Sequence, residues 1–230
     1  MAQLPPHIGT LNEKSLHAAL KEWYARPGDR LEVSIDGYVI DIVRGDLLIE
    51  IQTRSFGAMK RKLEKLTRHH RVRLVYPIAR EKWIVKQDSK GNEAGSRRKS
   101  PKRGSVEQIF DELVSIPKLL AEESLSLEIL LIQEEEVRRF GGGRRKWWRR
   151  KWRTHERLLL QVLESRRFNT PADLAQLLPA SLPDPFSTAD LAEALGIPRA
   201  VAQRMAYCLR EMGTIAAVDK RGNAILYSQS

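Results

Sequence analysis

Two strongly apolar segments, each carrying one acidic residue, flank a tight turn near the start of the chain. Residues 40–43 and 47–53 are these segments, and Arg44-Gly45-Asp46 joins them. The acidic residues are Asp41 and Glu50. A carboxylate inside a buried strand costs free energy unless another group compensates its charge. One divalent cation would compensate both, so this segment predicts a β-hairpin that carries a metal site.

The overall charge of the chain is strongly basic. It has 40 Lys and Arg residues against 29 Asp and Glu, which gives a formal net charge of +11. A protein this basic commonly meets a polyanion, with nucleic acid as the first expectation. A generally basic proteome or a solvated surface is the alternative. The clustering of the cations favours nucleic acid.

Cysteine content and hydropathy set further limits. The single cysteine, Cys208, excludes a disulfide framework and a zinc site built from several cysteines. We expect its side chain to lie in a core. No apolar run has the length of a membrane span, and the first residues lack the apolar stretch of a signal peptide. We therefore expect a cytoplasmic protein.

The first half of the chain mixes helix and strand patterns, which predicts an α/β domain with a central mixed sheet. Pro117 is expected to kink or end its helix early. Lys102 and Arg103 lie in a polar, basic loop that either holds substrate phosphate or is simply solvated. The expected helices cover residues 11–26, 56–69 and 106–120, the strands 31–35, 38–43, 47–53, 72–78, 83–85 and 125–133, and the loop 86–105.

A basic, tryptophan-rich segment follows at residues 138–153, with nine Arg or Lys among its sixteen positions. Its glycine triplet predicts a flexible joint. We therefore place one domain at 1–137, a linker at 138–153 and a second domain at 154–230. Cations neutralise phosphates and indoles stack on exposed bases, although an indole can also anchor the linker to a core. The residues expected to bind nucleic acid here are Arg144, Arg145, Lys146, Trp147, Trp148, Arg149 and Arg150.

The C-terminal part resembles a winged helix-turn-helix domain, and the second domain is therefore expected to be mostly α-helical. Helices are expected at 154–164, 170–178, 188–195 and 198–212, followed by a hairpin at 215–227. The resemblance rests on Leu191 to Pro198 and on the helix that follows. In a DNA-binding interpretation Arg199 and Gln203 enter the major groove, while Lys220 and Arg221 contact phosphate. The alternative is a domain that mediates only protein contacts.

The N-terminal part resembles the PD-(D/E)XK, or restriction-endonuclease-like, nuclease superfamily. The resemblance covers roughly residues 8–85 and rests on Glu13 in the first helix, Asp41 in the second strand and Glu50-Ile51-Gln52 in the third. Two departures are visible. Gln52 stands where these nucleases carry lysine, and Ile40 stands where they carry proline.

The resemblance implies the role of each residue. Asp41, Glu50 and the carbonyl of Ile51 would hold Mg²⁺ or Mn²⁺, with Glu13 assisting. Gln52 would orient the attacking water, or Lys60 or Lys62 would reach in from the next helix. Without a metal, Asp41 is explained by a strand end satisfied by a backbone amide or an arginine. Glu50 is then explained by an exposed strand position.

Three functions follow from these features. The first is a metal-dependent nuclease that hydrolyses DNA, with the winged helix binding the substrate. The second is a catalytically inactive DNA-binding protein or regulator on a nuclease fold, which Gln52 favours. The third is a nuclease directed at RNA or single strands, which the tryptophan-rich segment suits. A homodimer is implied by resemblance, because two strands of a duplex must be cut.

Overall fold

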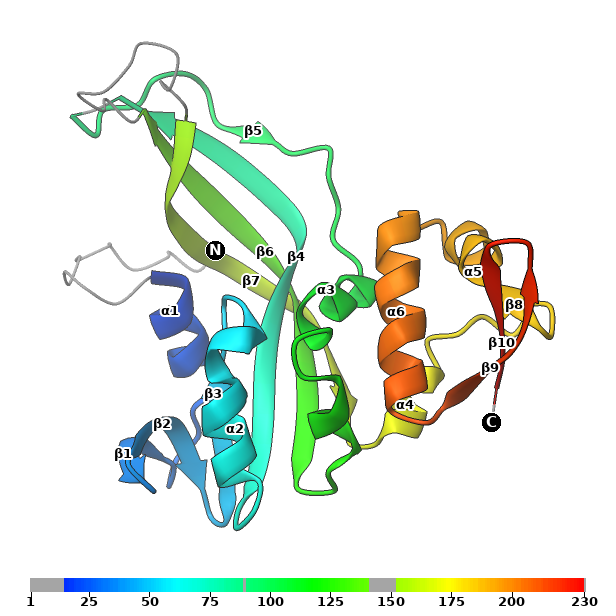
Figure 1. The fold of residues 1–230 in the computed structure, drawn as a ribbon. Helices are drawn as coiled ribbons and strands as arrows, with labels where there is room; N and C mark the ends of the chain where they lie inside the picture. Colours follow the sequence, from blue (N-terminus) through cyan, green and yellow to red (C-terminus); the bar gives the residue numbers. More distant parts are fainter. Residues whose placement is uncertain (1–14, 89, 141–151, 230) are drawn as a thin grey trace, which may run out of the picture.

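The computed structural model describes residues 15–88, 90–140 and 152–229 (Figure 1). Within them, one seven-stranded mixed sheet has the order β1-β2-β3-β4-β6-β7, with the short β5 paired to β4. The α/β class predicted from the sequence is confirmed. The strands are β1 (Arg30–Ile35), β2 (Tyr38–Arg44), β3 (Leu47–Ile51), β4 (Arg71–Gln87), β5 (Arg98–Lys99), β6 (Leu125–Phe140) and β7 (Trp152–Phe168).

The first three strands form the antiparallel hairpins that the sequence predicts. Asp36 and Gly37 both have positive φ, 51° and 82°, as the two central residues of a type I′ turn require. The second turn places Gly45 at φ 59°. Beyond β3 the chain crosses over through helix α2 (Lys60–Leu66), and β4 then runs parallel to β3. The long strands β4 and β6 are also parallel, so β3, β4 and β6 form the centre of the sheet.

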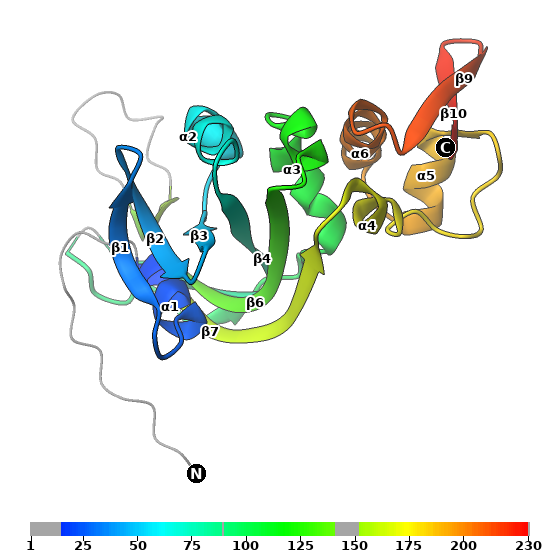
Figure 2. The ribbon, with the colours of Figure 1, turned by 90° about the horizontal axis from the view of Figure 1, so that it is seen from below.

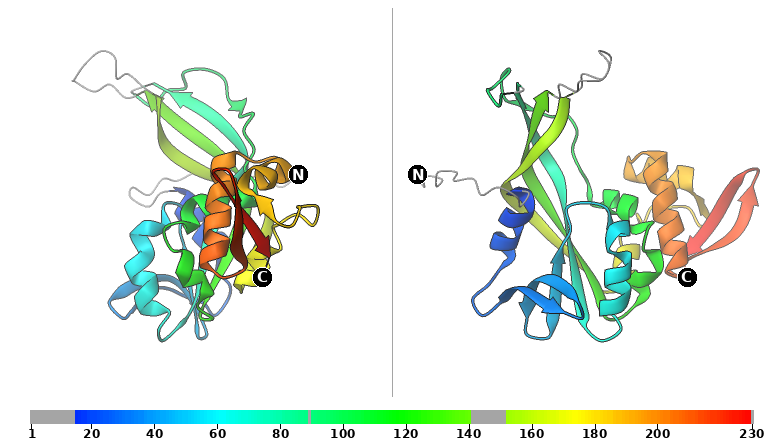
Figure 3. Two further views of the ribbon diagram at one scale, coloured as in Figure 1. Left: turned by 45° about the vertical axis from the view of Figure 1, so that its right-hand side comes forward. Right: turned by 60° about the vertical axis from the view of Figure 1, so that its left-hand side comes forward.

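Helices cover both faces of the sheet (Figures 2 and 3). On one face, α1 (Ser15–Tyr24) buries Leu16 and Leu20 against apolar residues of β3, β4 and β6. On the other, α2 buries Leu63 and Leu66 in the larger core, beside the short helix α3 (Phe110–Leu113). The parallel strands are therefore apolar on both faces, as expected for a buried parallel sheet.

Strand β7 contradicts the helix that the sequence predicts at residues 154–164. It pairs antiparallel with β6 along its whole length, from Phe140↔Trp152 to Leu127↔Phe168. Two of the register shifts in this ladder fall opposite residues 159–164. They leave Leu159 and Val162 packed on the same core although three positions separate them. This spacing imitates a helix, and pairing with β6 overrides it. The sheet thus continues past the boundary predicted at residues 138–153.

Other elements differ from expectation in extent. Residues 72–78 and 83–85 belong to one strand, β4, whose register with β6 shifts between Ala79 and Glu81. The helix expected at 106–120 is broken into 3₁₀ turns at Val106–Ile109 and Pro117–Ala121 on either side of α3. The helix expected at 56–69 likewise begins with a 3₁₀ turn, Phe56–Met59. Pro117 begins the last 3₁₀ turn of its region, consistent with the expected early end.

After β7 the chain forms three helices and a second sheet. These are α4 (Pro171–Ala175), α5 (Thr188–Leu195), α6 (Arg199–Glu211) and the strands β8 (Phe186–Ser187), β9 (Ile215–Arg221) and β10 (Ala224–Gln229). Thr170 and Ser187 cap α4 and α5 with complete capping boxes. The strands pair in the order β8-β10-β9.

Helix α6 joins this C-terminal part to the large sheet unit (Figure 1). Its buried residues, including Met205 and Cys208, share one continuous core with α3 and β6. Arg204 adds an ion pair to Asp111 on α3 at 2.7 Å. No helix in the described part of the chain is long and apolar enough to cross a membrane.

A strap, residues 100–104, runs across β4 before α3. Ser100 N–H donates to the Lys82 carbonyl at 2.7 Å and Gly104 N–H to the Ala79 carbonyl at 3.0 Å. A Cβ atom on Gly104 would lie 2.6 Å from that same Ala79 oxygen. Only glycine therefore lets the strap approach β4 this closely.

We expect Gly104→Ala to lower the free energy of unfolding by about 1–3 kcal/mol, because the added methyl group meets backbone that cannot move away. Urea unfolding followed by circular dichroism measures the change. Gly57→Ala is the matched control, since its Cβ would meet Ser55 and Ser115 at ordinary distances of 3.5 and 3.6 Å. Equal stability of the two variants would contradict the close approach of the strap.

Candidate active site on strands β2 and β3

Asp41 on β2 and Glu50 on β3 lie next to each other. Asp41 Oδ2 accepts a hydrogen bond from the Ile51 N–H at 2.8 Å, and the Glu50 carboxylate accepts one from the Asp41 N–H. Glu50 is only 4% exposed. The alternative explanation without a metal, an exposed strand position, is therefore wrong. Asp41 does have the backbone amide partner that such an explanation requires.

Lys62 on α2 completes the cluster from the sheet's other side. Its Nζ lies 2.6 Å from Glu50 Oε1 and donates to the Val39 carbonyl at 2.6 Å. Lys60 is half exposed and lies 4.0 Å from Glu64, so it does not take this place. Of the two lysines considered from the sequence, the structure brings Lys62 to the acidic pair.

Gln52 is placed differently from the expected lysine. Its side-chain amide donates to the Ser55 carbonyl at 3.4 Å, while its backbone N–H continues the pairing of β3 with β4. Through this hydrogen bond the Gln52 side chain stabilises the loop in which it lies. The positive charge beside Glu50 comes instead from Lys62.

His17 is a member of the cluster that the sequence analysis missed. It lies on α1, and its Nε2 is 3.2 Å from Asp41 Oδ2. The helical spacing of Leu16 and Leu20 predicts the helix but carries no signal that the residue between them meets β2. Glu13, predicted to assist, lies outside the described residues.

The pKa values of the two carboxyl groups are shifted in opposite directions. Burial raises the pKa of Glu50 to about 7, and the Lys62 ammonium offsets only part of this effect. Burial also acts to raise the pKa of Asp41. The hydrogen bonds from His17 and the Ile51 amide outweigh it and lower the pKa of that carboxyl below its ordinary value.

The donor set fits a magnesium ion that keeps part of its water shell. Among the described residues no group of three or more His, Cys, Asp or Glu side chains gathers as a full cage would. Mg²⁺ is commonly held by one or two carboxylates, with water and substrate phosphate completing its shell. Asp41, Glu50 and the Ile51 carbonyl supply hard oxygens of this kind. Glu50 Oε1 is buried and lies 2.6 Å from the Lys62 ammonium, so a bound metal ion would share this carboxylate with Lys62.

Cations and aromatic rings line the far halves of β4 and β6, which project beyond the helices as an arm (Figure 1). Trp83 is covered by Arg97 and Lys99, whose charged atoms lie 4.8 and 4.9 Å from its ring centroid. Trp152 packs on Phe140 with Lys86 5.0 Å away. Most of the predicted basic cluster, Arg144, Arg145, Lys146, Trp147, Trp148, Arg149 and Arg150, lies outside the described residues.

The remaining predicted contacts are spread over two places. Arg199 and Gln203 are exposed on α6, and Lys220 and Arg221 are exposed at the β9–β10 turn. Lys102 and Arg103 lie on the strap, where they line a pocket beside β4. Among the described residues no hydrogen bond or ion pair joins either group to Asp41 or Glu50, so these residues do not form one compact site with the acidic pair.

Comparison with known proteins places this fold in a family. Residues 14–169 match the model of a domain of unknown function, DUF8091, which spans the large sheet from α1 to the end of β7. The chain belongs to this family. The DUF8091 chain is also similar to an uncharacterized protein of Treponema pallidum (strain Nichols). The two are 38% identical over 222 residues, or 96% of this chain and 86% of the relative. No solved structure matches the DUF8091 chain.

The raised pKa of Glu50 predicts a pH dependence of stability. The folded protein holds this proton more tightly than the unfolded chain, whose ordinary value is 4.5. The wild type should therefore lose stability relative to Glu50→Gln as pH rises from about 4.5 to about 7, by on the order of 3 kcal/mol. Urea unfolding of both proteins across this interval measures the difference.

Glu64→Gln, which removes an exposed carboxyl from the same helix as Lys62, is the matched control. A stability difference between wild type and Glu50→Gln that stays constant through the interval would contradict the raised pKa.

Proposed function

We propose that this protein is a divalent-metal-dependent nuclease that hydrolyses phosphodiester bonds in DNA. The observation that carries the proposal is the cluster of Asp41, Glu50 and Lys62, with a buried carboxylate 2.6 Å from a lysine ammonium. Two acids and a lysine on adjacent elements are the groups that the resemblance to PD-(D/E)XK nucleases leads one to expect. Their order along the hairpin and the following helix supports the same assignment.

The residues divide the work in a simple way. Asp41, Glu50 and the Ile51 carbonyl hold the metal ion, which activates water and neutralises charge on the phosphate when bound. Lys62 lies beside Glu50 and supplies the charge that Gln52 lacks. His17 fixes the carboxylate of Asp41 from the opposite face of the sheet. A helix-borne lysine in place of the strand lysine thus removes the main sequence objection to activity.

The C-terminal part acts, in this proposal, as a winged helix that positions DNA. Two features support it: α5 meets α6 through a turn in which Gly196 adopts φ 62°, and the β9–β10 hairpin follows α6 directly. Arg204 is engaged by Asp111, so contact with a duplex falls to the first two turns of α6, where Arg199 and Gln203 are exposed.

Asp41→Asn and Glu50→Gln should each lower Mg²⁺- or Mn²⁺-dependent cleavage of plasmid DNA by about 10²-fold or more, because each removes a ligand charge. Lys62→Met should have an effect of similar size. Gln52→Ala should retain activity within about threefold, because its side chain contacts only Ser55 among the described residues. Initial cleavage rates are compared between variants that circular dichroism shows to be folded like the wild type.

A reversed order, with Gln52→Ala inactive and Lys62→Met active, would contradict the assignment of the lysine. Absence of cleavage by the wild type on duplex DNA, single-stranded DNA and RNA would instead favour an inactive DNA-binding protein. The ion pair that already neutralises Glu50 is the feature consistent with that second function. Calorimetric titration with Mn²⁺ separates the two, since the inactive protein should bind no metal at Asp41 and Glu50.

Arg199→Ala combined with Gln203→Ala should weaken duplex DNA binding about tenfold without changing cleavage of saturating substrate. Both side chains are exposed on α6, so stability should stay the same. Fluorescence anisotropy at fixed salt measures binding. Arg210→Ala, at the other end of the same helix, is the control. Equal binding by the double variant and the control would remove α6 from the DNA contact.

A further inference from the structure

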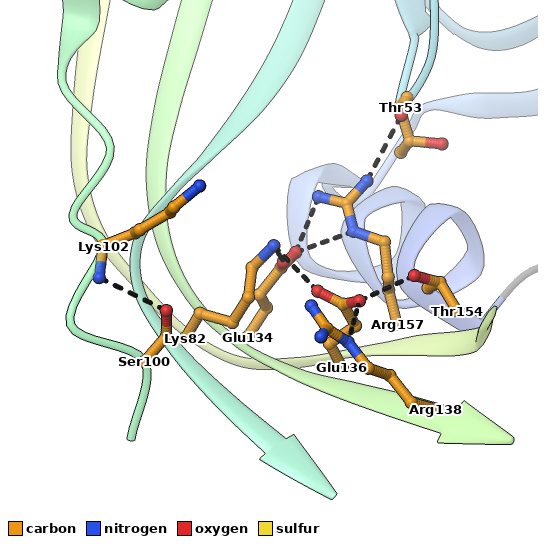
Figure 4. A network of polar contacts seen from close by, with 9 residues as sticks. All are labelled: Thr53, Lys82, Ser100, Lys102, Glu134, Glu136, Arg138, Thr154 and Arg157. Atoms are coloured by element: carbon orange, nitrogen blue, oxygen red, sulfur yellow. Dashed lines mark hydrogen bonds and ion pairs between the residues drawn. The ribbon is translucent and has the colours of Figure 1, made fainter. Parts of the chain in front are cut away.

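A polar pocket of roughly 420 Å³ lies between the strap and α3, against β4. Five cationic side chains line it: Lys82, Lys102, Arg103, Arg138 and Arg157. They come from the strap and from three strands, so sequence spacing does not bring them together. Figure 4 shows the Lys102 side chain extending from the strap toward the network that contains Lys82, Arg138 and Arg157.

Two buried carboxylates hold part of this cationic set in place. Glu134 is 0% and Glu136 5% exposed, and Lys82 Nζ lies 3.0 Å from both (Figure 4). Arg157 Nη2 lies 2.6 Å from Glu134, and Arg138 Nε donates to Glu136 at 2.8 Å. The arginines and lysine are therefore fixed in position before any ligand arrives, which lowers the entropic cost of binding.

The balance of charge leaves the pocket able to take an anion. The two buried carboxylates face three cations, Lys82, Arg138 and Arg157, so one positive charge is left over. Lys102 adds another, because among the described residues no carboxylate lies within ion-pair distance of its ammonium. An arginine has five N–H donors, and within the described part of the chain Arg138 uses only its Nε, which donates to Glu136. On the far wall Asp111 is paired with Arg204, whereas Glu112 accepts a hydrogen bond from the neutral Tyr76 hydroxyl and keeps its negative charge. With Glu112 counted, four cations face three carboxylates and one positive charge remains.

The pocket adjoins the candidate active site. Arg157 Nη1 donates to the Thr53 carbonyl at 3.3 Å, and Thr53 follows Glu50 by three residues, just past the end of β3. Three residues span at most about 10 Å. Tyr76 and Gln108 also line the pocket, and an aromatic ring and an amide are groups that contact bases.

We propose that this pocket binds the phosphate of a nucleotide unit that neighbours the scissile bond in a nucleic-acid strand. The phosphate meets Lys102 and the unoccupied N–H groups of Arg138, and the base lies toward Tyr76. Charge-assisted bonds of this kind suit a phosphate oxygen. The location of the scissile bond rests on the proposed function, whereas binding in the pocket does not require cleavage.

The test uses the full chain in EDTA, so that no hydrolysis occurs, and calorimetric titration with thymidine 5′-monophosphate, thymidine and a short oligothymidylate. We expect the monophosphate to bind where thymidine does not, and the oligonucleotide to bind more tightly than either. Lys102→Ala should weaken both interactions about tenfold, because it removes one charge-assisted contact. It leaves the buried network intact.

Lys118→Ala, at an exposed position outside the pocket, is the matched control and should bind like the wild type. Equal affinity of Lys102→Ala and Lys118→Ala, or equal affinity for thymidine and its monophosphate, would overturn the site. Binding of the monophosphate but not of the oligonucleotide would overturn its assignment to a strand. The titration is also repeated with Asp41→Asn, which should bind the nucleotide normally although it should not cleave DNA. A failure of the pocket can then be told apart from a failure of the proposed nuclease function.

Discussion

The parallel pairing of β4 and β6 supports every other feature of this protein. Fifteen Cα partners join the two strands, from Val72↔Leu125 to Gln87↔Arg139. One half is largely apolar on both faces and carries the helices; the other half carries cations, carboxylates and the indole of Trp83. The change falls near the register shift at Ala79 and Glu81, where the strap also meets β4. A single ladder thus joins a hydrophobic core to a charged surface without a separate linker.

The elements predicted best from the sequence are those whose signals are local. Signals of this kind are the turn at Asp36-Gly37, the capping residues Thr170 and Ser187 and the glycine that ends α5, each of which acts within a few residues. Strand β7 could not be predicted in this way. Its apolar residues follow a helical spacing, and only pairing with β6, from Phe140↔Trp152 to Leu127↔Phe168, decides its conformation.

The candidate site was predictable only in part for the same reason. Asp41 and Glu50 stand out because acids interrupt apolar strands, and their proximity follows from one short turn. Lys62 was a candidate through its place on the next helix. His17 was not, because a contact from α1 across β2 leaves no mark in the sequence. The network under Lys82 was invisible too, since Glu134 and Glu136 sit in an acidic run that suggests a solvated strand rather than a buried one.

The packing of α6 on α3 has a geometric consequence. A shared core and the Arg204–Asp111 ion pair fix the C-terminal helices to the sheet that carries Asp41 and Glu50. If the proposed nuclease function holds and α6 binds a duplex, the start of α6 and the two carboxylates are held at a fixed distance from each other. Cleavage would then fall at a constant number of nucleotides from the bound segment, rather than over the range of positions that a flexible linker permits.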